Sequence, residues 1–194
     1  MFSHSTNKEI TYSGTDSYKY VNKLLKNGTE LWIISPYISF DYAKLLVKYS
    51  KKKKIWLITS HNATNLKSIK YFESFSKFYK KILKSAVFFA FLAIATYLLN
   101  FHLLFGIMFA LTLFLGFMSI LSFNKKHLPN LKIKFSDKVF IHEKIYISDK
   151  EAITGSANLT FSGQHKNIEH IELTDSAEKI NGLKMHFHSL WETL

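Results

Sequence analysis

The sequence predicts an α/β fold in which a β-sheet flanked by helices is interrupted by a two-helix transmembrane hairpin. The chain has 194 residues, which suits one ordinary domain. Short apolar runs alternate with amphipathic helical patterns, as they do in β-α-β units. A stretch of 39 residues, from Ser85 to Phe123, contains no Asp, Glu, Lys or Arg. The composition, 47% hydrophobic and 21% charged with 7 Gly and 2 Pro, excludes disordered and fibrous chains.

The charged residues restrict the chemistry that the chain can perform. All 26 basic residues are Lys, against 14 acidic residues, and the formal net charge is +12. Without Arg, anions must be bound by Lys, backbone N–H groups, His or amides. The absence of Cys excludes disulfides, thiolate zinc sites and a Cys nucleophile, and fits a reducing compartment.

Before the uncharged stretch, helices and strands alternate. We expect a helix at Tyr18–Asn27, ended by Asn27-Gly28, a strand at Leu31–Ser35, closed by Pro36, a helix at Asp41–Tyr49 and a strand at Ile55–Thr59. This order predicts that the two strands pair in parallel. The next segment, Asn65–Lys84, reads as a helix that continues into the hairpin.

The uncharged stretch is close to the length of two membrane crossings, each of about 20 helical residues. The predicted helices are Ile82–Leu99 and Leu103–Phe123, with a turn near Asn100-Phe101-His102. The domain thus divides into a first part, residues 1–81, the hairpin, residues 82–124, and a second part, residues 125–194. The alternative, a buried hairpin in a soluble protein, would leave two helices without a solvent face.

Basic residues flank the hairpin on both sides, whereas its turn has no Lys. They are Lys77, Lys80, Lys81 and Lys84 before it, and Lys125, Lys126 and His127 after it. The positive-inside rule therefore predicts an integral membrane protein with the larger domain on the cytoplasmic side. The polar segment Met1–Tyr20 does not predict a signal peptide.

After the hairpin, four strands and a closing helix are expected. They are the strands Leu131–Phe135, Val139–Ser148, Glu151–Thr154 and Ile168–Leu173, and the helix Ser176–Leu194. The sheet would then be assembled from both sides of the insertion.

The strand Val139–Ser148 carries the first chemical motif. Because side chains alternate along a strand, His142 and Lys144 should lie on one face as surface neighbours, with Ile141, Ile145 and Ile147 on the other. The turn Gly155-Ser156-Ala157-Asn158 follows, and hydrogen-bonding groups of this kind near a helix N-terminus suit anions. Each piece alone has a structural explanation, so the combined spacing carries the signal.

That spacing resembles the phospholipase D superfamily, whose signature is His-x-Lys, four residues, Asp, about six residues, then Gly-Ser-x-Asn. In this chain the motif comprises His142, Lys144, Asp149, Gly155, Ser156 and Asn158, followed by Leu159-Thr160, Gly163 and Asn167-Ile-Glu169. The one departure is a gap of five residues between Asp149 and Gly155. The resemblance implies a mixed sheet flanked by helices. The β-α-β pattern that contains Ile33–Tyr37 resembles the first part of this fold.

The resemblance also implies roles for these residues. His142 attacks a phosphodiester phosphorus and forms a phosphohistidine, while a second His protonates the leaving alcohol. Lys144 and Asn158, beside Gly155, hold the substrate phosphate. Ser156 and Glu169 orient the nucleophilic His, and Asp149 acts as a structural hydrogen-bond acceptor. No metal or cofactor is implied, and His186 and His188 are poorly spaced for metal binding in a helix.

Because the chain has a single motif, the resemblance also implies a homodimer in which two copies of His142 face one active site. The hairpin favours phospholipase D-type hydrolysis or headgroup transfer on phospholipids of the membrane. The alternative is a metal-independent endonuclease acting on single-stranded DNA or RNA, which the Lys surplus also suits. A catalytically silent membrane scaffold is disfavoured, because every motif position holds the reactive residue type.

Overall fold

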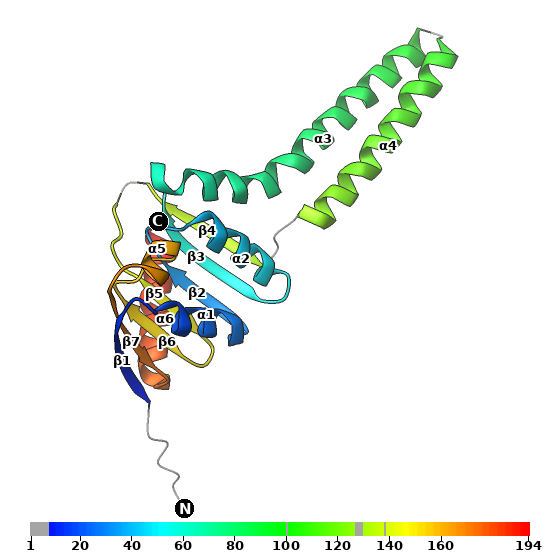
Figure 1. Cartoon of the computed structure of the whole chain (residues 1–194). Coiled ribbons are helices and arrows are strands. Elements are labelled where there is room, and N and C mark those ends of the chain that lie inside the picture. The colour runs from blue at the N-terminus through cyan, green and yellow to red at the C-terminus, as the bar shows by residue number, and fades with distance from the viewer. Residues whose placement is uncertain (1–7, 100, 127–129, 138) are drawn as a thin grey trace, which may run out of the picture. The chain divides into compact units, whose positions relative to one another are not determined.

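The computed structural model describes residues 8–99, 101–126, 130–137 and 139–194 (Figure 1). Asn100, in the predicted turn, and His127, in the predicted basic flank, lie outside the described residues. The chain divides into two compact units, residues 1–70 with 128–194, and residues 71–127. The first contains the sheet and the second contains most of two long helices.

A seven-stranded mixed sheet forms the first unit, with strand order β1-β7-β6-β5-β2-β3-β4. The strands are β1 Glu9–Gly14, β2 Glu30–Ile34, β3 Lys54–Ser60, β4 Leu131–Ser136, β5 Ile145–Ser148, β6 Ala152–Gly155 and β7 Glu169–Thr174. Strands β2, β3 and β4 pair in parallel, and all other neighbours are antiparallel. The parallel pairing of β2 with β3, expected from the β-α-β pattern, is confirmed.

The helices of the first unit are α1 Tyr18–Asn27, α2 Phe40–Ser50, α5 Phe161–His165 and α6 Ala177–Thr193, with the 3-10 turn η1 Ala63–Asn65. Helices α1, α2 and α6 pack on the sheet through buried apolar side chains. The range of α1 matches the predicted one residue for residue. Helix α6 packs on β2 and β5, and its buried Phe187 joins Trp32, Ile34, Ile145 and Ile147 in one core cluster. An α/β fold with a mixed sheet flanked by helices is therefore confirmed.

Two strand predictions need correction. Strand β1 was not expected, because the segment before Tyr18 is polar; its side chains alternate between exposed and half-buried, and it pairs only with β7. The predicted strand Val139–Ser148 is wrong in its first half, since β5 begins at Ile145. Ile145 pairs with Ile34, the last residue of β2, and Pro36, which lacks an N–H, follows shortly after. The segment before Ile145 therefore has no ladder partner on that side.

Two long helices make up most of the second unit. The helix α3, Leu66–Leu98, runs without a break from the first unit, as expected, and α4 spans His102–Lys126. Tyr97 and Phe105 contact across the pair, with ring centroids 5.3 Å apart. Large apolar side chains on both helices are exposed, including Leu98 and Leu103.

Among the described residues, one helical segment, His102–Leu121, is long and apolar enough to cross a membrane, with a mean hydropathy of 2.4. The matching part of α3, Ile82–Leu98, is apolar but shorter. The two helices thus form as predicted, whereas a pair of membrane crossings remains a prediction.

Candidate active site

Most of the motif residues gather at one edge of the sheet because of strand direction. Strand β5 runs antiparallel to β2 and β6, and β6 runs antiparallel to β7. The start of β5, the end of β6 and the start of β7 therefore meet beside the end of β2. His142 and Lys144 precede β5, Ser156 follows β6, and Glu169 opens β7.

His142 lies in the irregular segment before β5 and is exposed. Among the described residues, no hydrogen bond is formed by its imidazole, and its ring neighbour is Phe140, with centroids 5.8 Å apart. The side chains still alternate as expected although this segment is not a strand, because Ile141 packs with Ile145 and Ile147 in the core cluster that contains Phe187 of α6. The imidazole is thus open to a substrate or to a second subunit.

Lys144 is buried, with 5% of its surface exposed, and not a surface neighbour of His142 as expected. Its Nζ donates a hydrogen bond of 2.7 Å to the carbonyl oxygen of His142. Burial lowers the pKa of Lys144, and the negative charge of Glu169 opposes that effect. The ammonium therefore sits in a desolvated position, where its interaction with an anion is stronger than in water.

Glu169 is buried and fixes the neighbouring turn. Its carboxylate accepts hydrogen bonds from the Ser156 hydroxyl and from Asn167 Nδ2, the latter at 3.2 Å. The backbone N–H of His170 donates to Ser156 Oγ at 3.0 Å. The structure thus brings Lys144, Ser156 and Glu169 together, while the described residues include no hydrogen bond from any of these side chains to the His142 imidazole.

Asn158 is held by the short helix α5. Its carbonyl oxygen accepts from Gln164 Nε2 at 2.9 Å, and a Cβ on Gly163 would lie 2.9 Å from the same oxygen. Thr160 caps α5 by accepting the N–H of Gly163. The side-chain oxygen of Asn158 is buried and has no hydrogen-bond partner among the described residues. Unpaired buried polar atoms are uncommon, and this amide oxygen could pair only with a group that donates a hydrogen bond.

Asp149 lies at the other end of β5 from His142. Its carboxylate accepts the backbone N–H of Thr29 at 2.7 Å. Burial raises the pKa of Asp149, but the hydrogen bonds from Thr29 outweigh that and leave its pKa below the usual value. The five-residue gap, residues 150–154, comprises the end of the β5–β6 turn and most of β6; in the turn, Ser148 Oγ accepts the N–H groups of Lys150 and Glu151.

Three buried polar residues that support the site were not expected from the sequence. Asn65 Nδ2 donates to the carbonyl oxygens of Pro36 and Ser60, at 2.7 and 2.6 Å. Ser35 Oγ accepts the N–H of Leu159, and Tyr146 OH donates to the carbonyl oxygen of Ala157. These bonds join residues that are far apart in the sequence, so local sequence patterns did not predict them. The one local indication was Pro36, which marks the end of the strand.

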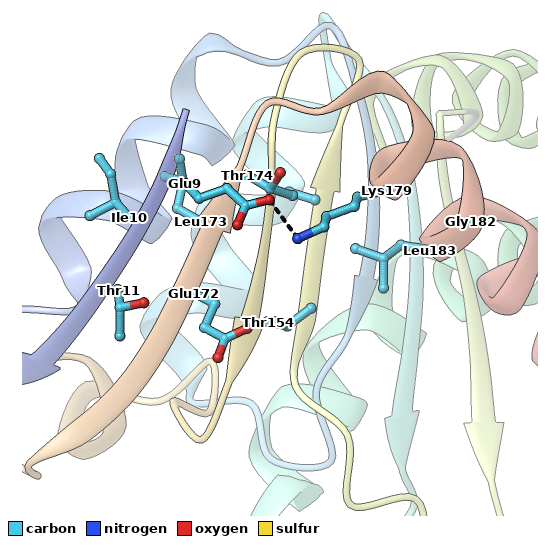
Figure 2. A pocket seen from close by; sticks show the side chains of 11 residues that line it. Glu9, Ile10, Thr11, Thr154, Glu172, Leu173, Thr174, Lys179, Gly182 and Leu183 are labelled. Atoms are coloured by element: carbon cyan, nitrogen blue, oxygen red, sulfur yellow. Dashed lines mark hydrogen bonds and ion pairs between the residues drawn. The ribbon is translucent and has the colours of Figure 1, made fainter. Parts of the chain in front are cut away.

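A separate hollow of about 480 Å³ lies between α6 and the strands β1, β6 and β7 (Figure 2). Lys179 of α6 reaches across it to Glu9 of β1, with Nζ and Oε1 2.5 Å apart. The hollow contains none of the motif residues, so it is distinct from the candidate site. In the described part of the chain, no group of three His, Asp or Glu side chains could hold a metal ion.

Comparisons with known proteins agree with this geometry. A model of the family described as cardiolipin synthase, PLD-like domain, matches residues 119–191. NucT from Helicobacter pylori shares the fold, with 16% identity, a TM-score of 0.58 and 96% of each chain covered. So does Nuc, a phospholipase D family member from Salmonella typhimurium, with 13% identity, a TM-score of 0.57, and 96% of this chain and 95% of that chain covered.

A third similar structure is TrmBL2, an archaeal chromatin protein, with 12% identity and a TM-score of 0.53. The match covers 98% of this chain and 54% of that chain. No curated protein matches the sequence.

The chain thus has the fold of phospholipase D-family structures, and its residues 119–191 match a phospholipase D-like family model. This match agrees with the resemblance predicted from the motif, whose residues lie within 119–191.

Gly155 ends β6 beside the site, and we expect any side chain there to be costly. Its φ is +150°, and a Cβ would lie 2.1 Å from the carbonyl oxygen of His170. Replacing Gly155 by Ala should lower the free energy of unfolding by about 2 kcal/mol or more, measured by chemical denaturation. The control is Gly182→Ala in α6, where a Cβ meets open space and should raise stability by roughly 0.5–1 kcal/mol. Equal stability of the two variants would contradict this account.

Proposed function

We propose that the chain is a phosphodiesterase that acts through a phosphohistidine at His142. One imidazole nitrogen attacks the phosphorus, the bond from phosphorus to the leaving oxygen breaks, and a second imidazole gives that oxygen a proton. Water or another alcohol then attacks the phosphohistidine, passes its proton to the second imidazole and releases His142. The observation that carries the proposal is the exposed His142 imidazole beside the buried Lys144.

Lys144 and Asn158 suit the stabilisation of the five-coordinate phosphorus. Lys144 is desolvated, and the side-chain amide of Asn158 carries two N–H donors on Nδ2 that suit a phosphate oxygen. Fixed donors of this kind stabilise developing charge because they need no reorganisation during the reaction. In this proposal Glu169 and Ser156 orient His142 once substrate is bound, and Gly155 leaves room for the phosphate.

The second imidazole is proposed to be His142 of another copy of the chain. Each chain has one motif, so a twofold dimer would give two copies of His142 facing one phosphate. The exposure of His142 supports this arrangement, since a partner can reach it.

We expect His142→Ala to abolish turnover while the variant still dimerises and unfolds at the wild-type temperature. If both copies of His142 serve one phosphate, a dimer with one variant subunit is also inactive. Co-expression of wild type and variant in equal amounts should then leave about one quarter of the wild-type activity per total protein, not one half. Retention of one half would contradict the shared site, and an active pure variant would contradict the nucleophile.

Phospholipids are the proposed substrates. Two large apolar side chains flank the motif in exposed positions: Phe140, 60% exposed, contacts His142, and Ile168, 82% exposed, precedes Glu169. Exposed apolar groups around a site indicate an interaction with apolar material. The apolar segment His102–Leu121 supports membrane attachment, and Lys84 with the other flanking lysines supports a cytoplasmic domain.

A second candidate is a nuclease acting on single-stranded DNA or RNA. The similar structure TrmBL2 is described as binding DNA, and the chain has 26 Lys against 14 acidic residues. Lysine-rich surfaces bind nucleic-acid backbones without sequence preference.

The two substrates are separated by one incubation of detergent-purified protein in EDTA. We expect phosphatidic acid from phosphatidylglycerol or cardiolipin vesicles, and intact single-stranded DNA and RNA. Phe140→Ser should lower the rate on vesicles but not on a soluble short-chain diester, because the chemistry is retained. Nicked nucleic acid with intact lipid would favour the nuclease, and no reaction with either would favour the scaffold.

Membrane attachment has its own test, which is extraction of cell membranes with alkaline carbonate. We expect the chain to stay in the membrane pellet, because an uncharged segment of about 20 residues partitions into the hydrocarbon. Its release into the supernatant would contradict the transmembrane hairpin.

A further inference from the structure

The segment that carries His142 has little backbone structure of its own. Its residues precede β5 and pair with no strand. Lys144 holds the carbonyl oxygen of His142, and the N–H of Gly155 donates to the carbonyl oxygen of Lys144 at 3.2 Å. A reacting group must be held within a fraction of an ångström, and a flexible segment does not achieve this without further contacts.

Those contacts come from α6. The residue before His142, Ile141, is buried in the same core cluster as Phe187. The residue after it, Glu143, pairs with His186, with Glu143 Oε2 and His186 Nε2 2.7 Å apart. Consecutive residues of α6, His186 and Phe187, therefore belong to the two interactions that flank His142, a directed polar bond to Glu143 and the core cluster that holds Ile141.

We propose that His186 is a positioning residue whose bond to Glu143 fixes the place of the His142 imidazole. This proposal rests on the proposed function, in which His142 is the nucleophile. Ile141 alone cannot set the rotation of the segment, because apolar packing is not directional. The bond to Glu143 adds a second contact, which is directional. One contact on each side of His142 then defines the orientation of the segment.

Helix α6 is a firm support for such a bond. Its Phe187 and Ile180 are buried in the core cluster, and Lys134 Nζ donates to the carbonyl oxygen of Trp191 near its C-terminal end. The side chains of His186 and Glu143 are 47% and 45% exposed. A half-exposed ion pair contributes little to global stability. Its loss should therefore change the reaction rate much more than the unfolding temperature.

The test measures kcat, KM and amide hydrogen exchange on the full-length dimer in detergent. His186→Ala and Glu143→Ala should each lower kcat by about tenfold with little change in KM, because a small misplacement of the nucleophile slows the chemical step. The double variant should be no slower than either single variant, since both remove the same bond. His186→Gln, whose amide can still donate to Glu143, should recover most of the rate.

Hydrogen exchange gives a readout that does not depend on activity. Exchange at residues 141–144 should rise in His186→Ala and stay at the wild-type level in the control His188→Ala. His188 lies on the same helix, but its ring contacts Trp32, with centroids 6.4 Å apart. Unchanged exchange in His186→Ala, or additive losses in the double variant, would overturn the proposal. If wild type shows no turnover but exchange rises as expected, the proposed function fails and the bond to the motif segment stands.

Discussion

The burial of two opposite charges, Lys144 and Glu169, is the constraint on which the site depends. Removing either charge from water is costly, so each needs partners within the fold. Glu169 has two side-chain donors, and Lys144 has a carbonyl oxygen and the field of Glu169. These partners come from the ends of β5, β6 and β7. The antiparallel order of those strands is therefore what allows a charged cluster to exist at this edge.

Much of the fold could be predicted from local patterns. Helix α1 followed from its apolar spacing and the Asn27-Gly28 ending, and β2 and β3 followed from buried runs. Strand β1 could not be predicted, because an edge strand with one half-buried face has a weak apolar signal. The first half of the strand predicted at Val139–Ser148 failed for another reason. Its alternation is real, but the strand that should pair with it ends at Ile34.

The candidate site was accessible from the sequence only as a list of residues. The spacing of His142, Lys144 and Ser156 predicted their chemistry through the family resemblance, and strand direction brings their segments together. The supports could not be predicted, since Asn65 bonds to Pro36 and Ser60 by backbone oxygens that any residue carries. The burial of Lys144 could not be predicted either, because a buried ammonium needs a nearby negative charge. That charge is Glu169, which lies 25 positions further along the chain.

Because β1 pairs with β7, the sheet joins the first strand of the chain to the last one synthesised. On the ribosome, β1, β2 and β3 emerge first, then α3 and α4, and only afterwards the remaining strands. Strand β1 has β7 as its one neighbour in the sheet, and both His142 and Glu169 follow α4. A nascent chain therefore contains the long apolar helices before it contains His142 or Glu169. Both helices have therefore been made before the residues of the candidate site are added.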